Sequence, residues 1–283
     1  EAFEMRTAII LPAHNVEQSV RDTLENLKPY QERVFFVDDG SSDHTREVIR
    51  KQGFHCISHA KNQGMSKAIL TGMKVAKESL FEAVIILDSD GQHSPKYIPQ
   101  FERELQYCSV VTGDRFHSFQ NLPSNKIASN AMGAAILFDL YQCNIFDTSC
   151  GYKGFRLDEE LMAVAEASFS YSFVFDILLD ALNRGKLISS VKIDCVYPAS
   201  EFHYTKRAEI ISFISSFQRY VMKEQFGKLG LEELQESVNV PENFVFKIQN
   251  LSFYGFYLRE YDGYILQTDL VKLEQWVGEN IRK

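Results

Sequence analysis

Short apolar runs, each ending in polar or turn-forming residues, recur along the first 116 residues of the chain. Segments with helical spacing separate these runs, as where Val20, Leu24 and Leu27 share one face. The apolar runs predict strands within 7–15, 33–45, 54–60, 82–90 and 108–116. The spaced segments predict helices at 16–30, 44–53, 65–79 and 95–106.

Turn and cap residues suggest where some of these elements begin and end. We expect Pro12 to end the first strand, because proline has no N–H to give to a ladder. Ser42 or Asp43 is expected to cap the second helix. Pro95 suits the first turn of the fourth helix, where the missing N–H costs nothing.

Strands that alternate with helices predict an α/β fold with a parallel sheet covered on both faces. In such sheets, ligands bind beyond the carboxyl ends of the strands. The unusual polar residues of this chain follow four of the predicted strands, at Pro12–Glu17, Asp38–Asp43, Asp88–His93 and Gly113–Arg115. We therefore expect a functional site at this edge of the sheet.

The pattern is looser after residue 116. It predicts helices at 127–142, 170–185 and 209–227, a turn-rich segment with a short strand at 146–156, and a strand at 189–198. An aromatic-rich tail occupies 228–283. The amphipathic helix at 209–227 and this tail either lie on a membrane interface or pack within the molecule or a dimer. No internal repeat or low-complexity segment appears.

Composition narrows the classes of protein that the chain can belong to. Its 283 residues suit one large domain, or a domain with an appendage. The net charge of −8 argues against a nucleic-acid partner, because neutralising phosphates needs clustered Lys and Arg. Five cysteines without a CxxC pair suggest neither a zinc site nor a disulfide framework, which favours a reducing compartment.

No secretory signal is evident, and no apolar run approaches the ~18–20 residues that a membrane helix needs. The longest stretch of small and apolar residues is "AMGAAILF" at 131–138. We expect a cytoplasmic protein, with peripheral attachment to a membrane left open.

The segment "AVIILDSDGQHSP" places two carboxylates, Asp88 and Asp90, directly after an apolar run. Carboxylates this close repel each other unless a proton or a cation neutralises one of them. A hard divalent metal such as Mg²⁺ or Mn²⁺ can do so, and it commonly binds phosphate oxygens as well. The alternative interpretation is a capped turn, in which Asp and Ser are common.

Three further segments have a similar pair of interpretations. Carboxylates in "VDDGSSD" (37–43) can accept hydrogen bonds from a base or a ribose, or can serve a turn and an N-cap. In "PAHNVE" (12–17), Glu17 can meet a nucleoside, or Asn15 can cap a helix. The glycine-containing turn in "NQGMSKAILTG" (62–72) can face a nucleotide with backbone N–H groups. It is neither GxGxxG nor a P-loop, so hydride and ATPase chemistry are not supported.

Taken together, these motifs resemble the family 2 glycosyltransferases, and within them the polyprenyl-phosphate branch (dolichyl-phosphate mannose and glucose synthases). The matching segments are "IILPAHNVE", "VDDGSSDHT", "KNQGMSKAILTGM", "ILDSDGQHSP", "VTGDRF" and "DTSCGYKGFR", in family order over about residues 6–200. The resemblance implies a GT-A fold, a Rossmann-like and mostly parallel sheet flanked by helices. It implies a glycosyltransferase domain at 5–225 and a C-terminal extension of unnamed role at 226–283.

The resemblance also implies a role for individual residues. Nucleotide-binding residues carried over from the family motifs are Pro12, His14, Glu17, Asp38, Asp39, Asn62, Gly64, Lys67 and Ser89. Asp88 and Asp90 take the metal role for Mg²⁺ or Mn²⁺. Val16 and Leu178 stand where relatives have acidic residues, and these two departures favour the alternative of a degenerate, non-catalytic nucleotide-sugar-binding protein.

A second group of residues is implied near the diphosphate and the acceptor. Arg115 and Lys153 match basic residues that face phosphate, and Asp147 is the acid of the "DTSCG" segment. Residues expected near the diphosphate or acceptor are Gln92, Lys126, Asp176 and Lys206. His203 is either a metal ligand, as a late histidine is in several GT-A enzymes, or an exposed loop residue.

The implied reaction is an inverting, metal-dependent transfer of a sugar from a UDP- or GDP-linked donor. A hydroxyl acceptor must lose a proton to a base. A phosphate monoester is already anionic at neutral pH, because its second pKa is about 6. "FDTSCGYKGF" looks more like the lipid-phosphate branch than like relatives that glycosylate hydroxyls. We expect a polyprenyl phosphate as acceptor, with a glycan or small-molecule hydroxyl as the alternative.

Overall fold

The computed structural model describes residues 5–116, 130, 133–134, 137, 141–168 and 172–194. Its strands are β1 (Thr7–Ala13), β2 (Val34–Asp38), β3 (His55–Ser58), β4 (Ala83–Ile86), β5 (Val110–Asp114), β6 (Lys153–Arg156) and β7 (Ile188–Lys192). Its helices are α1 (Val20–Leu27), α2 (Thr45–Lys51), α3 (Met65–Glu78), α4 (Ile98–Leu105), α6 (Glu159–Ala167) and α7 (Phe173–Asn183). Short 3-10 helices occupy Lys28–Arg33 and Pro95–Tyr97.

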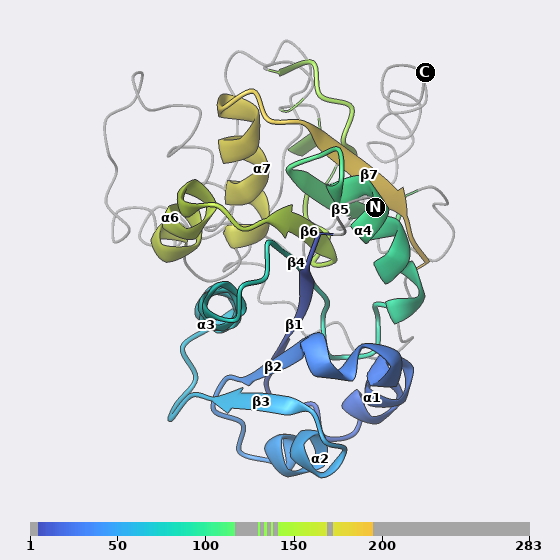
Figure 1. Ribbon diagram of the computed structural model, residues 1–283, viewed down its shortest axis with the longest axis vertical. Helices are drawn as coiled ribbons and strands as arrows, with labels where there is room; N and C mark the ends of the chain where they lie inside the picture. The colour runs from blue at the N-terminus through green and yellow to red at the C-terminus, as the bar shows by residue number, and fades with distance from the viewer. Residues whose placement is uncertain are drawn as a thin grey trace, which may run out of the picture. The chain divides into compact units, whose positions relative to one another are not determined.

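The strands form one seven-stranded sheet in the order β3-β2-β1-β4-β6-β5-β7. Figure 1 shows this order from bottom to top. β3, β2, β1 and β4 pair in parallel, and β5 pairs in parallel with β7. β6 is antiparallel to both of its neighbours. The expectation of a mostly parallel α/β sheet is confirmed, with β6 as the one reversed strand.

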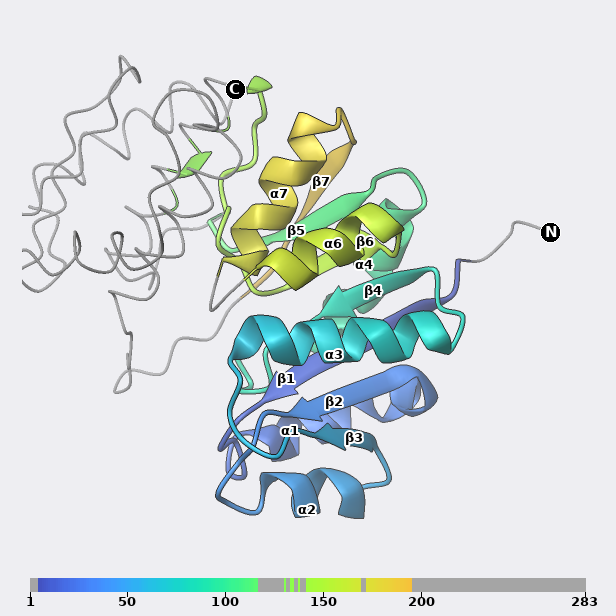
Figure 2. The same ribbon diagram turned by 90° about the vertical axis from the view of Figure 1, so that its left-hand side faces the viewer.

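Helices cover both faces of the sheet, and each face has its own core. Figure 2 shows α3, α6 and α7 in front of the strands. Their apolar side chains pack with one set of strand residues, including Ile10, Ile86 and Phe155. Residues of α1, α2 and α4 pack with the alternate set, including Ile9 and Leu11. Alternate residues of a strand point to opposite faces, so strands covered on both sides are apolar almost throughout.

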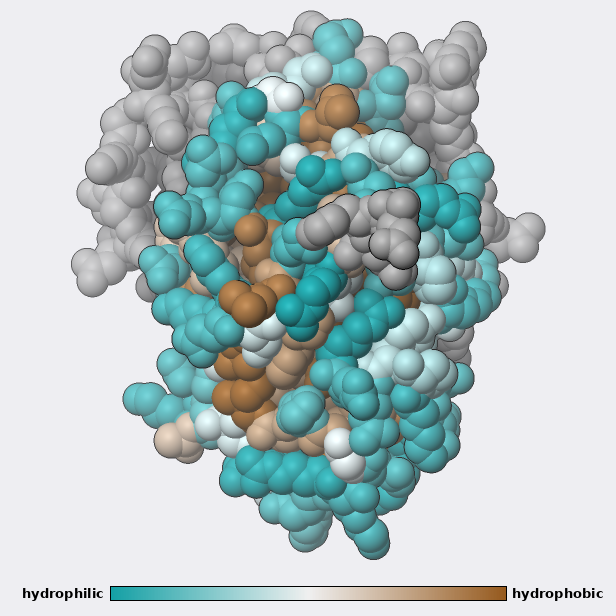
Figure 3. All heavy atoms as spheres, viewed as in Figure 1, coloured by the Kyte–Doolittle hydropathy of each residue, from teal (hydrophilic) through white to brown (hydrophobic). Residues whose placement is uncertain are grey.

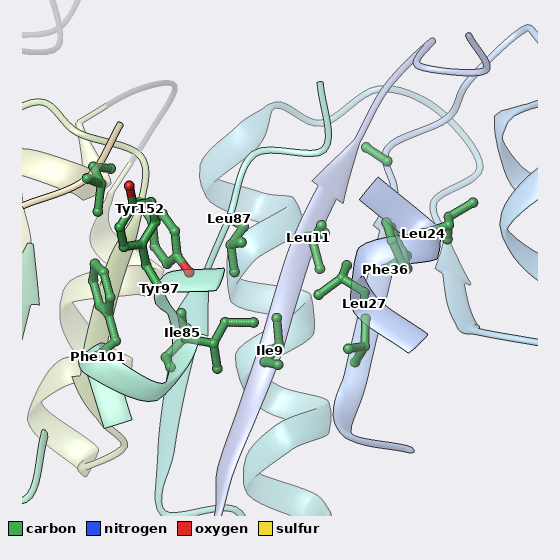
Figure 4. Packing of buried hydrophobic residues seen from close by; sticks show 14 of the residues in the cluster. Ile9, Leu11, Leu24, Leu27, Phe36, Ile85, Leu87, Tyr97, Phe101 and Tyr152 are labelled. Atoms are coloured by element: carbon green, nitrogen blue, oxygen red, sulfur yellow. The ribbon is translucent and has the colours of Figure 1, made fainter. Parts of the chain in front are cut away.

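Figure 4 shows the second of these cores from close by. Ile9 and Leu11 of β1 lie between Phe36 of β2 and Ile85 of β4, and the side chains of α1 and α4 close over them. Every one of these four residues has no exposed surface. This packing holds β1 rigidly in the middle of the parallel strands and so determines where their carboxyl ends lie.

Two details differ from the sequence-based expectations. Pro12 does not end β1, because the strand runs on to Ala13 and Pro12 pairs in register with Val37. The backbone of Pro12 points toward the β4 side of β1, at a level where β4 has already ended. The missing N–H of Pro12 therefore removes no hydrogen bond between the two strands. α6 was not predicted. Asp158 caps it by accepting a hydrogen bond from the Leu161 backbone N–H at 2.7 Å.

Close contacts divide the chain into two compact units. The first unit comprises Glu1–Arg115 and Cys150–Ala199 and contains the whole sheet. The second comprises Phe116–Ser149 and Ser200–Lys283, of which only part of 116–149 is described. The predicted boundary at residue 225 lies outside the described residues and stays a prediction.

Hydrophilic residues cover most of the face seen in Figure 3, and hydrophobic residues show there only in a narrow strip. Among the residues that the structure describes, the strongly exposed large apolar side chains are Leu80, Tyr107 and Leu187. No helix within the described ranges is both long and apolar enough to cross a membrane.

Candidate functional site

The carboxyl ends of β3, β2, β1 and β4 meet at one edge of the sheet, because these four strands are parallel and in register. Ala13 pairs with Asp38, and Asp38 with Ser58. Backbone hydrogen bonds continue the ladders past the strand ends, from Asp39 N–H to the Ala13 carbonyl and from His59 N–H to the Asp38 carbonyl. The segments that carry the predicted site residues therefore start side by side.

At the end of β2, Asp38 and Asp39 are both buried but have different partners. Asp38 accepts hydrogen bonds from Ser41 N–H at 3.1 Å and from Arg46 Nε at 3.1 Å. Arg46 lies in the first turn of α2, so this ion pair joins the strand end to that helix. Asp38 thus shapes the turn after β2, and its predicted contact with a nucleotide stays a prediction.

Asp39 binds the loop that precedes α3. Its carboxylate accepts hydrogen bonds from the backbone N–H groups of Gln63 at 2.9 Å and Gly64 at 2.7 Å. Gly64 has φ +90°, a left-handed conformation that favours glycine. Asn62 supports the same turn, since its Oδ1 also accepts from Gly64 N–H at 3.0 Å. Asn62 and Gly64, both predicted to bind nucleotide, are therefore held against Asp39.

After β1, the chain turns through His14 to Glu17. His14 Nδ1 lies 3.0 Å from the Asp39 carbonyl oxygen. Glu17 accepts a hydrogen bond from His44 N–H at 3.2 Å, and its side chain keeps about a third of its surface exposed. Asn15 Oδ1 accepts from Ser42 N–H at 2.9 Å, so this segment is tied to the loop between β2 and α2.

At the end of β4, the three residues of the DSD motif lie differently. Ser89 is buried, and its hydroxyl donates to the Pro12 carbonyl at 2.6 Å, which joins the ends of β4 and β1. Asp90 is exposed and accepts from Gln92 N–H at 2.9 Å. Desolvation raises the pKa of Asp90, and the neighbouring charge of Asp88 raises it further. The side chain of Ser89 thus faces inward, and its predicted nucleotide contact stays a prediction.

Two residues fix the position of Asp88. His93 is buried, and its Nδ1 lies 3.2 Å from the Asp88 backbone N–H and 3.3 Å from Asp88 Oδ2. Gly151 packs against the Asp88 carboxylate, so closely that a Cβ there would stand 2.6 Å from Asp88 Oδ2. The ring of Tyr152 lies against His93, with centroids 5.4 Å apart. Only glycine at position 151 leaves room for the observed Asp88 carboxylate.

Asp88 and Asp90 fit a hard divalent cation by their chemistry. They supply carboxylate oxygens, the ligands that Mg²⁺ and Mn²⁺ prefer, and their mutual repulsion is what a cation would relieve. No cluster of three or more His, Cys, Asp and Glu side chains suited to a metal occurs in the part of the chain that the structure describes. Diphosphate oxygens and water would have to complete the coordination sphere.

The predicted basic and acidic residues beyond the strand ends are mostly buried. Lys153 has no exposed surface and donates from Nζ to Thr112 Oγ1 at 2.8 Å. Asp176 is buried on α7 and accepts hydrogen bonds from the hydroxyls of Ser168 and Ser172, each at 2.7 Å. Arg115 is 7% exposed. A phosphate contact of Arg115 or Lys153 stays a prediction.

Lys67 and Asp147 complete the described candidates. Lys67 lies in the first turn of α3 and donates to the Glu166 carbonyl at 3.2 Å. Asp147 is fully buried in the second unit. The turn that follows it is held by Asn130, whose Oδ1 accepts from Ser149 N–H at 2.9 Å. Lys126, His203 and Lys206 lie outside the described residues.

Sequence reasoning placed His93 in the polar segment Asp88–His93 without giving it a role, and did not identify His59, Asn130 or Gly151 as site residues. His59 stands three positions before Asn62 in "SHAKNQG", and His93 stands three after Asp90. Their proximity to motif residues was the available signal. Neither position alone indicates which carboxylate the ring meets, since His59 reaches Asp39 across 20 positions and His93 meets Asp88 only through the turn after β4.

The strand order and the acidic residues at the carboxyl edge define an α/β fold of the GT-A glycosyltransferase class. Among solved structures, the chain is similar to glucosyl-3-phosphoglycerate synthase from Mycobacterium tuberculosis, crystallised with Mn²⁺, UDP and glucosyl-3-phosphoglycerate. The TM-score is 0.59 at 14% sequence identity, covering 75% of this chain and 80% of the other. At this identity the likeness establishes the fold alone.

Residues 8–161 match the model of the family "Glycosyl transferase family 2". This match spans more than half of the chain, so the protein belongs to the family 2 glycosyltransferases and is a glycosyltransferase. The resemblance inferred from the motifs is confirmed.

Two relatives are named for sugar transfer to a polyprenyl phosphate. One is the UDP-N-acetylglucosamine–dolichyl-phosphate N-acetylglucosaminyltransferase of Methanococcus voltae, 26% identical over 76% of this chain and 94% of the relative. The other is the undecaprenyl-phosphate mannosyltransferase of Micrococcus luteus, 25% identical over 68% and 84%. The chain thus resembles the polyprenyl-phosphate branch over most of the length of both relatives.

Proposed function

We propose that the protein is an inverting, metal-dependent glycosyltransferase that moves a sugar from a nucleotide-diphosphate donor to a polyprenyl phosphate. One observation carries the proposal: Asp88 and Asp90 follow β4 at the same edge of the sheet where Asp38 and Asp39 follow β2. Ligands of open α/β sheets bind at this edge.

The donor half of the proposal rests on the carboxylate pair. Asp88 and Asp90 would hold Mg²⁺ or Mn²⁺, which, when bound, would neutralise charge on the leaving diphosphate. His93 and Gly151 keep the Asp88 carboxylate in one place, so little reorganisation is needed when a donor arrives. The loop held by Asp39 would present the N-terminus of α3 toward the nucleotide.

The acceptor half rests on the relatives and on the chemistry of phosphate. Both of these relatives are named for transfer to a polyprenyl phosphate. A phosphate monoester is already a nucleophilic anion at neutral pH and needs no base. Asp147, the acid of the "DTSCG" segment, is fully buried, which suits an acceptor of this kind better than a hydroxyl that must lose a proton.

Calorimetry with a panel of UDP- and GDP-sugars, with and without Mn²⁺, tests the donor half. We expect one donor class to bind, and its affinity to rise when Mn²⁺ is present. Asp88→Asn and Asp90→Asn should each abolish the response to Mn²⁺, because a neutral amide is a poor ligand for a hard cation. Asp22→Asn, which changes an exposed carboxylate on α1, is the matched control and should behave as wild type. Absence of binding to every donor would refute the proposal.

A further inference from the structure

His59 joins three parts of the nucleotide edge that are separate in the sequence. Its backbone N–H donates to the Asp38 carbonyl at 2.9 Å, directly after β3. Its ring Nδ1 lies 2.7 Å from Asp39 Oδ1, and its ring Nε2 lies 2.9 Å from Thr71 Oγ1 on α3. The side chain is only 9% exposed. The ring therefore connects the end of β2 to the middle of α3.

The chemistry of the partners determines the direction of these hydrogen bonds. An ionised carboxylate can only accept, so the ring nitrogen next to Asp39 must carry a proton. In the neutral ring, the other nitrogen is then an acceptor, and the Thr71 hydroxyl donates to it. Asp39 thus selects the tautomer whose Nδ1–H points at it, and the Thr71 hydroxyl matches this tautomer by donating to Nε2.

This arrangement leaves Asp39 little freedom. A carboxylate offers about four acceptor sites. Three are taken, by His59 Nδ1, Gln63 N–H and Gly64 N–H. Asp39 can therefore accept about one more hydrogen bond, and the three donors determine where that acceptor site points. Without the ring of His59, only backbone groups of one exposed loop would hold the carboxylate.

We propose that His59 is a positioning residue of the nucleotide site, which orients the Asp39 carboxylate and the Gln63–Gly64 turn for the donor nucleotide. The proposal rests on the proposed function, because it presumes that a nucleotide binds at this edge. Within the described residues, the His59 ring reaches the site through Asp39, so it acts on donor binding and leaves the transfer step itself alone.

Two substitutions separate the contacts of the ring. In His59→Asn the amide nitrogen stands near the position of Nδ1 and can still donate to Asp39, whereas the contact with Thr71 is lost. In His59→Gln the longer side chain reaches the position of Nε2, and the contact with Asp39 is lost. We expect His59→Gln to raise the Kd and the KM for the donor roughly tenfold or more, with kcat changed less than about twofold. His59→Asn should stay nearer to wild type.

Isothermal calorimetry with the donor that binds wild type, together with initial rates, provides these constants. Thermal midpoints of both variants control for folding. Should both unfold, Thr71→Val keeps the ring and removes its hydroxyl partner, and it should weaken donor binding with kcat maintained. If His59→Gln binds the donor as tightly as wild type, the inference about His59 is wrong, while the proposed function still stands. The same holds for Thr71→Val where that variant is needed. A wild-type protein that binds no nucleotide sugar would refute the proposed function, and with it this inference.

Discussion

At the scale of single residues, Gly151 illustrates how much of the site depends on close packing. Its Cα lies so near Asp88 that a methyl group would meet Oδ2 at 2.6 Å and Oδ1 at 2.8 Å. The carboxylate would have to move, because real Cβ atoms do not approach oxygen this closely. Asp88 is one of the two residues that we propose to hold the metal, so its displacement would disturb the proposed metal site.

We predict that Gly151→Ala lowers glycosyltransferase activity about a hundredfold, since misplacing a reacting group by about 1 Å can cost this much. Gly154→Ala is the matched control on β6, where a Cβ would meet only the side-chain carbons of Leu105 and Phe101, at 3.1 and 3.2 Å. It should reduce the free energy of unfolding by about 1 kcal/mol and keep its activity. Equal activity of the two variants would contradict the role assigned to Gly151.

Tyr152 presents the opposite case, a polar group with nothing to bind. Its ring stacks on Phe101 with centroids 4.3 Å apart, and the side chain is fully buried. Among the described residues, its hydroxyl has no hydrogen-bond partner. Burial raises the pKa of this hydroxyl far above its usual value, so it stays neutral. A buried, unsatisfied hydroxyl costs about 1–3 kcal/mol.

Tyr152→Phe should therefore stabilise the protein, by about 1 kcal/mol or a rise of roughly 2–4 °C in Tm. Differential scanning calorimetry measures this shift, and donor binding should remain unchanged. A lower Tm would mean that the hydroxyl has a partner after all.

The sequence predicted which carboxylates follow which strands, but not what each of them binds. Asp39 and Asp88 lie at the predicted edge because strand direction and register bring them there. The inward turn of Ser89 toward Pro12 joins residues 77 positions apart, and no local pattern encodes such a contact. The same holds for His59, whose ring meets Asp39 across 20 positions.

At the scale of elements, the apolar runs predicted all the strands of the parallel half to within a few residues. β1, β2 and β4 are buried on both faces, so their signal is a simple apolar run, whereas β3 is a partly exposed edge strand. The reversal of β6 was not predictable, because it depends on Ile86 pairing with Lys153 across a long stretch of chain. α6 was missed although Asp158 and two following glutamates mark its start.

The cap of α6 yields a prediction at this scale. Asp158→Ala removes the acceptor of the Leu161 N–H bond and should lower the free energy of unfolding by about 1 kcal/mol. Asp158→Asn keeps an oxygen in place and should cost less. Urea denaturation of the three proteins compares them, and the 3.7 Å contact of Asp158 with Lys186 is lost equally in both variants. If Asp158→Ala and Asp158→Asn lower the free energy of unfolding equally, the loss comes from the charge of Asp158 and not from its hydrogen bond to Leu161 N–H.

At the scale of the whole molecule, the family and the GT-A fold could be predicted from the combination of motifs in order. Each motif alone can also be explained as a turn or a helix cap. Four motifs at the ends of predicted strands are better explained by a single site at one edge of one sheet. The donor base and the sugar could not be predicted, because they depend on the shapes of loops. The role of residues 226–283 stays open to experiment as well.

The most direct test of the central claim is a product assay with labelled nucleotide sugars. Wild-type protein is incubated with Mn²⁺, a panel of UDP- and GDP-sugars, and a polyprenyl phosphate in detergent micelles, and the product is identified by mass spectrometry and NMR. We predict one sugar on the lipid phosphate, with its anomeric configuration inverted relative to the donor, and no product from Asp88→Asn. A retained configuration, a sugar attached only to a hydroxyl acceptor, or equal product from Asp88→Asn would contradict the account.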